Sequence, residues 1–147
     1  MAKTFDFWNI YIDRMKKYHT KNRCKYLLKL HIVFVVKYRK SILTGAIADD
    51  IKQFCMDVCK KNDVEVNMLN TDKNHIHLLV DVPPTLSPTS LVQYLKQETT
   101  WNVWKQHSNE LKQHFWKKSV FWSDGYFVCS TGDVSTQTIL EYIKSQG

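Results

Sequence analysis

The stretch DVEVNMLNTDKNHIHLLVDVPP, residues 63–84, decides the fold, because two apolar runs in it are separated by a short polar turn. Residues 63–70 and 74–82 have the β-branched, partly alternating composition that is typical of strands, and so short a turn joins two strands into a hairpin. Pro83 and Pro84 end the second run, since proline cannot donate a hydrogen bond to a β-ladder. The stretch therefore predicts two neighbouring antiparallel strands.

Two histidines stand inside the second of these strands. Because successive side chains of a strand alternate between faces, His75 and His77 point to one face and the intervening Ile76 points to the other. Two imidazoles about 6–7 Å apart on one strand face can bind one metal ion or one phosphate. A half-buried strand with polar side chains on its solvent face would show the same pattern. The pair alone leaves both interpretations open.

The sequence on either side of the hairpin predicts the rest of the fold. Strand-forming residues fill 24–37, and apolar residues recur at helical spacing in 46–62 and 89–106. Two short strands about a turn at residues 123–125, and a last helix that begins near Asp133, complete the order. This order predicts an α+β fold, in which a ferredoxin-like or split βαβ antiparallel sheet has helices packed on one face.

The length and composition predict one folded domain. The 147 residues are 44% hydrophobic and 13% aromatic, which excludes a disordered chain. We interpret residues 24–147 as a single domain and residues 1–23 as an N-terminal extension of unknown role. Lysines interrupt the most apolar region and no secretory signal precedes it, so we expect a cytoplasmic location and no membrane partner. Cys55 and Cys59 lack the spacing of a zinc site and are expected to be reduced and buried.

Positive charge is concentrated in the first quarter of the chain. The net charge is +7, but residues 1–40 contain eleven Lys or Arg and two Asp and carry +9, which leaves −2 for the rest. Such asymmetry favours a polyanionic partner, with nucleic acid before a membrane surface. Lys37, Arg39 and Lys40 follow the first long strand and are candidates for phosphate contacts, although a solvated strand end would have the same composition.

The last predicted helix contains a second candidate pair. Tyr142 and Gln146 are four residues apart, so they lie one above the other beside the apolar stripe of that helix. A tyrosine at the edge of such a stripe is often only part of the core. Together with the two histidines, however, a glutamine oxygen completes a ligand set for a divalent ion. Such an ion would favour the phenolate and polarise a phosphodiester, since an unperturbed phenol is a poor nucleophile. The combination is consistent with tyrosine-phosphodiester chemistry.

With these motifs in order along the chain, the sequence resembles the HUH single-tyrosine transposases, the TnpA type of small bacterial and archaeal insertion sequences. The resemblance covers the chain from about Lys25 onward. The REP-associated tyrosine transposases are close relatives, and the motifs do not separate a host-serving role of that kind from a role in a mobile element. The matching motifs are HIVFVVKYRKSILTG at 31–45, TDKNHIHLLVDVPP at 71–84, SLVQYLK at 90–96, FWSDGYFVCSTG at 121–132 and EYIKSQ at 141–146.

The resemblance implies a catalytic site and its cofactor. The family's two metal-binding histidines fall on His75 and His77, its nucleophile on Tyr142 in the C-terminal helix, and the residue that completes its metal site on Gln146. The metal would be Mg²⁺, with Mn²⁺ able to substitute, and no nucleotide would be consumed. The implied activity is cleavage and rejoining of single-stranded DNA at insertion-sequence ends through a 5′-phosphotyrosine intermediate, with recognition of DNA hairpins. The enzyme would be associated with the nucleoid when bound to DNA.

The resemblance also implies a homodimer whose active sites can be shared between chains. Residues 130–132 connect the last helix to the body, and Gly132 leaves the backbone there free to redirect that helix. We therefore interpret Gly132 as a hinge that lets the helix dock on its own body or on that of a partner.

The second long helix departs from the family pattern. Many members have Lys-Gly followed by an arginine where this chain has LKQETTWNVWKQ, with Gln97 and Trp101. Lys96 is still a candidate for contact with hairpin phosphates. With Leu91 and Leu95, Trp101 is expected among the apolar positions of this helix.

The alternative from a different class is a non-catalytic, ferredoxin-like module that binds single-stranded nucleic acid. In that case Tyr126 and Phe127 would stack on bases. The two histidines, Tyr142 and Gln146 would then be scattered in the structure, whereas their convergence on one site would favour the enzyme.

Overall fold

The computed structural model describes residues 18–117, 119–130 and 136–146. The hairpin that the sequence predicted is formed by β4 and β5. In chain order the elements are β1 (His19–Lys21), β2 (Cys24–Tyr26), β3 (Lys29–Val35), the short 3-10 helix η1 (Lys37–Arg39), α2 (Gly45–Lys61), β4 (Glu65–Asp72), β5 (His75–Asp81), α3 (Pro88–Leu111), β6 (Phe127–Cys129) and α4 (Thr136–Ser145).

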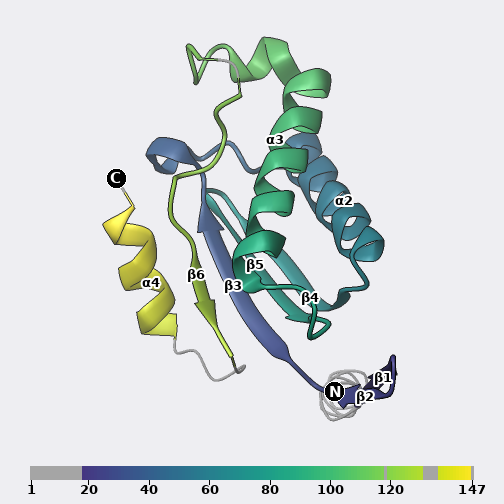
Figure 1. Cartoon of the computed structure of the whole chain (residues 1–147). Helices are drawn as coiled ribbons and strands as arrows, with labels where there is room; N and C mark the ends of the chain where they lie inside the picture. Colours follow the sequence, from purple (N-terminus) through teal and green to yellow (C-terminus); the bar gives the residue numbers. More distant parts are fainter. Residues whose placement is uncertain (1–17, 118, 131–135, 147) are drawn as a thin grey trace, which may run out of the picture.

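Four strands form one antiparallel sheet in the order β4-β5-β3-β6 (Figure 1). In the pairing of β5 with β3, His77 lies opposite Val33, and on the other side of β3 the same valine lies opposite Phe127 of β6. The antiparallel pairing of all four strands confirms the predicted α+β architecture. Because β5 and β3 are the central strands, the two histidines lie in the middle of the sheet and not at its edge.

One face of the sheet is covered by α2 and α3 (Figure 1). Alternate residues of the two central strands point into this layer, and Ile32, Phe34, Ile76 and Leu78 are fully buried there. Burial of one such side chain stabilises the fold by about 1.5–3 kcal/mol, so this layer is the main source of stability. The helices contribute the buried residues Ile47, Ile51 and Val58 from α2 and Leu91, Leu95 and Val103 from α3.

The opposite face of the sheet carries the two histidines and α4. His75 and His77 belong to the other set of alternate residues in β5 and are paired with Val35 and Val33 of β3. Ile143 of α4 is buried against these two valines. The terminal helix therefore packs on the face that α2 and α3 leave open, beside β6 (Figure 1).

The predicted strand 24–37 is divided in the structure. Its first part, β2, pairs with β1 in a separate two-stranded sheet, and only β3 joins the main sheet. Alternation along one strand cannot reveal which partner the strand pairs with, so this division was not predictable. Of the two short strands expected about residues 123–125, only β6 forms, because Trp122 makes no more than an isolated bridge to Val36.

Helix α3 is longer than predicted and buries a different tryptophan. Trp101 was expected among its apolar positions, but its side chain is 72% exposed. Trp104, three residues later, is buried instead, and its indole N–H donates to the carbonyl oxygen of Val120 at 2.8 Å. None of the helices in the described part of the chain combines the length and the apolar character needed to cross a bilayer.

The cysteines of α2 behave as predicted. Cys55 and Cys59 are free thiols in the core beneath the sheet. Burial raises the pKa of Cys59 to about 12, so the thiol is uncharged and unreactive at neutral pH.

Candidate active site

The rings of His75 and His77 meet above β5. Their Nε2 atoms are 2.9 Å apart and their ring centroids are 4.7 Å apart. Nδ1 of His75 lies 2.8 Å from Oδ1 of Asn74, so this nitrogen donates its proton to the amide and Nε2 is left as an acceptor. The Nε2–H of His77 then donates to that acceptor. A cation bound between the rings would take the place of this proton, and Asn74 fixes the ring orientation that makes this possible.

Both imidazoles are held in the uncharged form. Burial lowers the pKa of His75. Burial, and to a lesser extent the neighbouring His75 and His31, together lower the pKa of His77 to about 4, with Asp72 acting weakly in the opposite direction. At neutral pH the pair is therefore neutral, which is the state in which imidazole binds metal ions.

A third histidine, which the sequence analysis did not single out as a site residue, lies next to this pair. His31 of β3 is 7% exposed, and its ring centroid is 5.8 Å from that of His77. Its Nε2 atom is buried and has no hydrogen-bond partner in the part of the chain that the structure describes. His31 precedes Val33 by two residues, and Val33 pairs with His77, so all three share one face. This register cannot be read from the sequence, which is why His31 was missed.

Tyr142 of the terminal helix and Gln146, the residue that follows this helix, lie together beside Gly125. The Tyr142 ring packs against that of Phe127 at a centroid distance of 5.8 Å. A Cβ atom added to Gly125 would lie 3.5 Å from the Tyr142 hydroxyl and 3.3 Å from Gln146 Oε1. The hydroxyl and the amide oxygen therefore reach the same point, just ahead of β6.

The Tyr142 hydroxyl is buried without a hydrogen-bond partner among the described residues. Burial raises the pKa of Tyr142 to about 12, so the phenol is neutral at physiological pH and becomes a nucleophile only when its proton is removed. An unsatisfied buried hydroxyl costs about 1–3 kcal/mol. A ligand that supplies a partner for this group would therefore bind favourably at this point.

The histidine pair and the tyrosine share one face of the sheet. Ile143, next to Tyr142 in sequence, packs on the two valines of β3 that pair with His75 and His77. One strand, β3, therefore separates the histidines from β6, where Tyr142 and Gln146 lie. The candidate residues are grouped on this face and are not scattered over the molecule. The hinge interpreted at Gly132 lies outside the described residues.

The basic residues after β3 form an exposed turn. Tyr38 and Arg39 have positive φ angles of 60° and 52°, an uncommon conformation for residues other than glycine. Nζ of Lys37 is 3.5 Å from Oδ1 of Asp124, whereas Arg39 is exposed and Lys40 is half-buried. Phosphate contact by these residues stays a prediction.

Lys96 of α3 makes its contacts inside the protein. Its Nζ atom donates to the carbonyl oxygens of Ser123 at 2.7 Å, Asp124 at 3.2 Å and Gly125 at 2.7 Å. An ammonium group has three donors, and these three carbonyls engage all of them. Burial lowers the pKa of Lys96 to about 8; Asp124 acts to raise this pKa, and Lys37 acts to lower it. In this arrangement Lys96 has no donor left for the hairpin phosphate that it was expected to contact.

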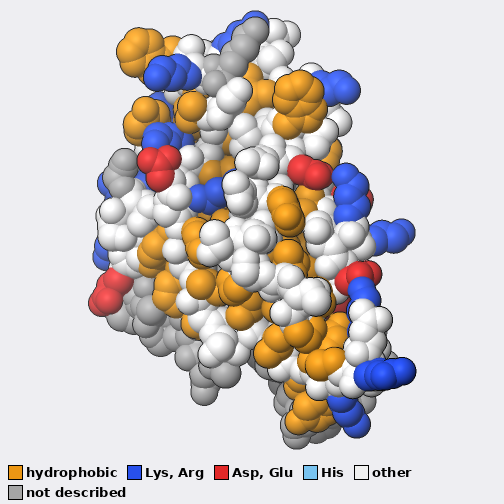
Figure 2. Space-filling model, in the orientation of Figure 1, with side chains coloured by type: hydrophobic (Ala, Val, Ile, Leu, Met, Phe, Trp, Pro, Cys, Tyr) orange, Lys and Arg blue, Asp and Glu red, His pale blue; other side chains and the backbone are white. Residues whose placement is uncertain are grey.

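A groove of about 890 Å³ runs between α3 and the segment 119–124. The exposed Trp101 lines it, together with Lys37, Lys105 and Lys112. On the face drawn in Figure 2, basic and hydrophobic side chains intermingle. Lysines beside an exposed aromatic ring are typical of surfaces that bind single-stranded nucleic acid. Lys105 and Lys112 were not singled out from the sequence, and Lys112 lies beyond residue 106, where the helix was predicted to end.

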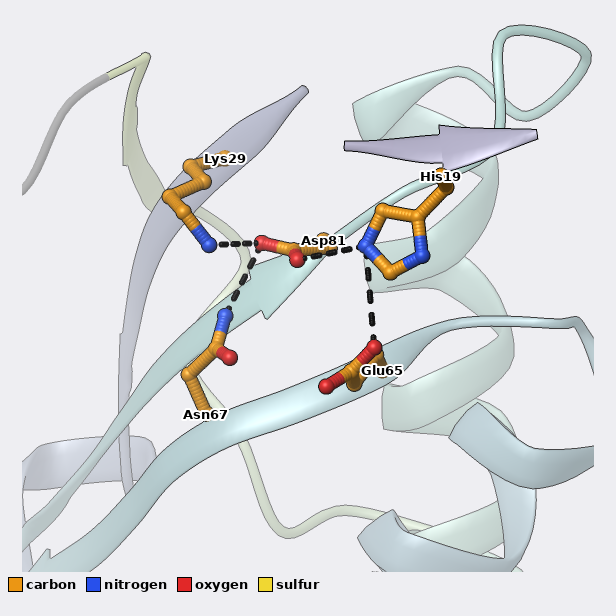
Figure 3. Close-up of polar contacts among 5 residues, drawn as sticks. All are labelled: His19, Lys29, Glu65, Asn67 and Asp81. Atoms are coloured by element: carbon orange, nitrogen blue, oxygen red, sulfur yellow. Dashed lines mark hydrogen bonds and ion pairs between the residues drawn. The ribbon is translucent and has the colours of Figure 1, made fainter. Parts of the chain in front are cut away.

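A second group of potential metal ligands lies at the other end of β5 (Figure 3). The ligand atoms of His19, Glu65 and Asp81 lie within 4.8 Å of one another. Asp81, however, is 2% exposed and is already paired with an ammonium group. We therefore interpret the group as a polar latch between β1 and the main sheet. Asp81 accepts hydrogen bonds from His19 Nε2 at 2.7 Å, Lys29 Nζ at 2.6 Å and Asn67 Nδ2 at 2.9 Å.

Comparison with known sequences gives one consistent family. The family model described as "Transposase IS200 like" matches residues 24–146. The transposase for insertion sequence element IS200 of Salmonella typhimurium is 31% identical over 134 residues, which cover 91% of this chain and 84% of that protein. The ISDra2 transposase TnpA of Deinococcus radiodurans is 28% identical over 121 residues, or 82% of this chain and 85% of that protein.

Solved structures of transposases have the same fold. A putative transposase from Deinococcus radiodurans R1 superposes with a TM-score of 0.79 at 25% identity, over 87% of this chain and 97% of that chain. A REP-associated tyrosine transposase bound to a REP hairpin superposes with a TM-score of 0.53 at 14% identity, over 86% of this chain and 70% of that chain. At that identity the second likeness concerns the fold alone.

Proposed function

The chain belongs to the IS200-like transposase family, and from that membership we propose that it cleaves and rejoins single-stranded DNA through a covalent link to Tyr142. The observation that carries the proposal is the proximity of the Tyr142 hydroxyl and Gln146 Oε1 at Gly125, on the sheet face that holds the histidine pair. A nucleophile and potential metal ligands on one face are what the reaction requires.

The proposed reaction is a transesterification at Tyr142. The phenolic oxygen attacks the phosphorus of one phosphodiester, an O–P bond forms, and the bond from that phosphorus to the 3′ oxygen breaks. The phenol loses its proton and the departing 3′ oxygen takes one up, which gives a 5′-phosphotyrosine and a free 3′-hydroxyl. In strand transfer a 3′-hydroxyl attacks the phosphotyrosine and the phenol is restored. No nucleotide is consumed, because one ester replaces another at each step.

We propose His75, His77 and Gln146 as the ligands of a divalent ion, Mg²⁺ with Mn²⁺ able to substitute. The two neutral Nε2 atoms that face each other, and an amide oxygen next to the tyrosine hydroxyl, fit such an ion. Imidazole ligands suit Mn²⁺ better than Mg²⁺, so we expect tighter binding of Mn²⁺. When bound, the ion would supply positive charge that polarises the phosphodiester and favours the phenolate.

DNA with hairpins at the ends of an element is the proposed substrate. The net positive charge of the chain and the groove beside Trp101 support a nucleic-acid partner. Lys37, Arg39 and Lys40 are proposed to contact phosphates from the exposed turn after β3. A tyrosine transposase of the same fold is bound to a REP hairpin, which supports hairpins as the form of DNA to test first.

We also propose a homodimer in which the terminal helix can dock on either chain. Where the side chains of this helix are described, Ile143 is buried on Val33 and Val35 of the sheet. The same contact can be made on the body of a partner chain.

Replacing Tyr142 by phenylalanine tests the proposal, because this change deletes only the hydroxyl. The wild-type protein with Mg²⁺ should form a covalent adduct with labelled single-stranded DNA from the flanks of its own coding sequence, visible on a denaturing gel. Tyr142→Phe should bind the same DNA with unchanged affinity and form no adduct. Tyr94→Phe, which alters a partly exposed tyrosine of α3, is the matched control and should react as the wild type does.

Two results would contradict the assignment. An adduct that persists in Tyr142→Phe would point to another nucleophile, with Tyr126 as the next residue to test. Hairpin binding by the wild type without any adduct in Mg²⁺ or Mn²⁺ would favour the non-catalytic binding module instead.

A further inference from the structure

The ammonium group of Lys96 binds three successive carbonyl oxygens of one turn. It reaches from the middle of α3 to Ser123, Asp124 and Gly125, at distances of 2.7, 3.2 and 2.7 Å. One ammonium group can donate to three consecutive carbonyl oxygens only where each carbonyl turns toward the same point. The turn at residues 123–125 is thus shaped around this one side chain.

Lys96 is held in an environment that does not suit a surface lysine. Its Nζ atom lies 5.9 Å from the ring centroid of Phe34 in the core and 6.0 Å from that of Tyr126. Burial lowers its pKa to about 8. A charge is retained in such surroundings when its donors are satisfied, as they are here by the three carbonyls. A lysine that served only to contact a phosphate would gain from full exposure.

The turn held by Lys96 is the surface on which the tyrosine rests. At its last residue, Gly125, an added Cβ would lie in ordinary van der Waals contact with the Tyr142 hydroxyl and closer than that to Gln146 Oε1, so both groups lie beside the glycine backbone. The chain then enters β6, whose first residue, Phe127, packs on the Tyr142 ring. On the other side of the turn, Lys37 reaches Asp124 at 3.5 Å. Lys96 and Tyr142 therefore contact the same three-residue turn from different elements.

We propose that Lys96 is a positioning residue for Tyr142: by holding the carbonyls of residues 123–125, it sets the place at which Gly125 supports the tyrosine hydroxyl and the Gln146 amide. The inference rests on the proposed role of Tyr142 as the nucleophile. In this role Lys96 affects the rate at which Tyr142 attacks DNA and does not affect the affinity of the protein for DNA. A displacement of about 1 Å in a reacting group can lower a rate by about 100-fold, so the loss of three hydrogen bonds at this turn should be readily measured.

Lys96→Met is the first test, because methionine keeps the length and apolar stem of the side chain and removes all three donors. The full chain with Mn²⁺ and the hairpin DNA that the wild type cleaves is assayed at saturating DNA for the rate of adduct formation. Separately, DNA affinity is measured over a range of salt concentrations. We expect the rate to fall at least about tenfold, with affinity and salt dependence within about twofold of the wild type. Lys96→Arg, which retains charged donors, should recover part of the rate.

Two further variants separate positioning from other effects. Lys60→Met removes an exposed charge from α2 and should change neither quantity. Gly125→Ala disturbs the packing of the turn against Tyr142 and Gln146 without changing Lys96, since its Cβ would lie 3.3 Å from Gln146 Oε1. It should lower the adduct rate with unchanged affinity, and it leaves Lys96 itself intact should Lys96→Met fold poorly.

The possible outcomes are distinct. A wild-type rate in both Lys96→Met and Gly125→Ala would overturn the inference while leaving the function of Tyr142 in place. Loss of affinity and a flatter salt dependence in Lys96→Met, at an unchanged saturated rate, would overturn it in favour of a phosphate contact. Absence of an adduct in the wild type would contradict the proposed function first and this inference with it.

Discussion

In the proposed metal site the imidazoles of His75 and His77 are both largely buried and uncharged, and single neighbouring residues keep them in that state. Asn74 fixes the proton of His75 on Nδ1, and burial together with His31 keeps His77 uncharged. The same-face placement of the pair follows from strand alternation and was predictable from the sequence. The places of His31 and Lys96 were not, because they depend on strand register and on the path of a turn that no local pattern encodes.

Replacing the proposed metal ligands His75 and His77 should abolish the stabilisation of the protein by Mn²⁺. Mn²⁺ should raise the thermal unfolding midpoint, because an ion that binds only the folded chain at 100 times its Kd stabilises it by about 2.7 kcal/mol. His75→Ala and His77→Ala should each lose most of this shift and nearly all adduct formation. His114→Ala, a histidine that follows α3, should retain both. An undiminished Mn²⁺ shift in the double His75→Ala, His77→Ala variant would remove the proposed metal site.

At the scale of elements, the spacing of apolar residues in the sequence predicted the hairpin and the helices, whereas contacts between segments distant in sequence could not be predicted from it. The strands β4 and β5 and the helices α2 and α3 form where composition and spacing indicated. The pairing of β1 with β2 was not predicted. Neither was the polar latch, in which His19 of β1 binds Asp81 of the main sheet. Residues 19, 29, 67 and 81 are far apart in sequence, and hydrogen bonds between such residues leave no periodic signal.

The latch gives a prediction about stability. Asp81→Asn removes the charge that compensates Lys29, whose side chain is only 10% exposed, and breaking such a buried pair costs about 3–5 kcal/mol. Urea unfolding followed by tryptophan fluorescence should show this loss as a lower midpoint. Asp49→Asn, which removes an exposed partner of Lys52, should leave the midpoint nearly unchanged. Equal midpoints for Asp81→Asn and the wild type would show that the latch contributes nothing.

At the scale of the whole molecule, the proposed active site is built from two parts with different attachments. The histidines are fixed in a central strand of the sheet, whereas Tyr142 belongs to a short helix that buries Ile143 on that sheet, and Gln146 follows directly after this helix. The family membership was predictable from ordered motifs. Which body the helix docks on cannot be derived from one chain, because the same contact can be made within a chain or between two chains.

Mixed dimers test this arrangement. One chain carries His75→Ala and His77→Ala, the other carries Tyr142→Phe, and each should be inactive alone. If sites form between chains, the intact helix of the first meets the intact histidines of the second, and adduct formation should return on mixing and refolding. A heterodimer that is confirmed by differential tagging and yet forms no adduct would show that each site is built within one chain.

The position of β6 in the sheet also has a consequence for how the enzyme is made. During synthesis, β3, β4, β5, α2 and α3 leave the ribosome before β6 and α4 and can already bury their common core. The open edge of β3 then receives β6, a strand of three residues, and the helix with the tyrosine follows it. The proposed nucleophile is thus the last part to join the sheet. An incomplete nascent chain would carry the histidines without Tyr142, so under the proposed function it could not cleave DNA.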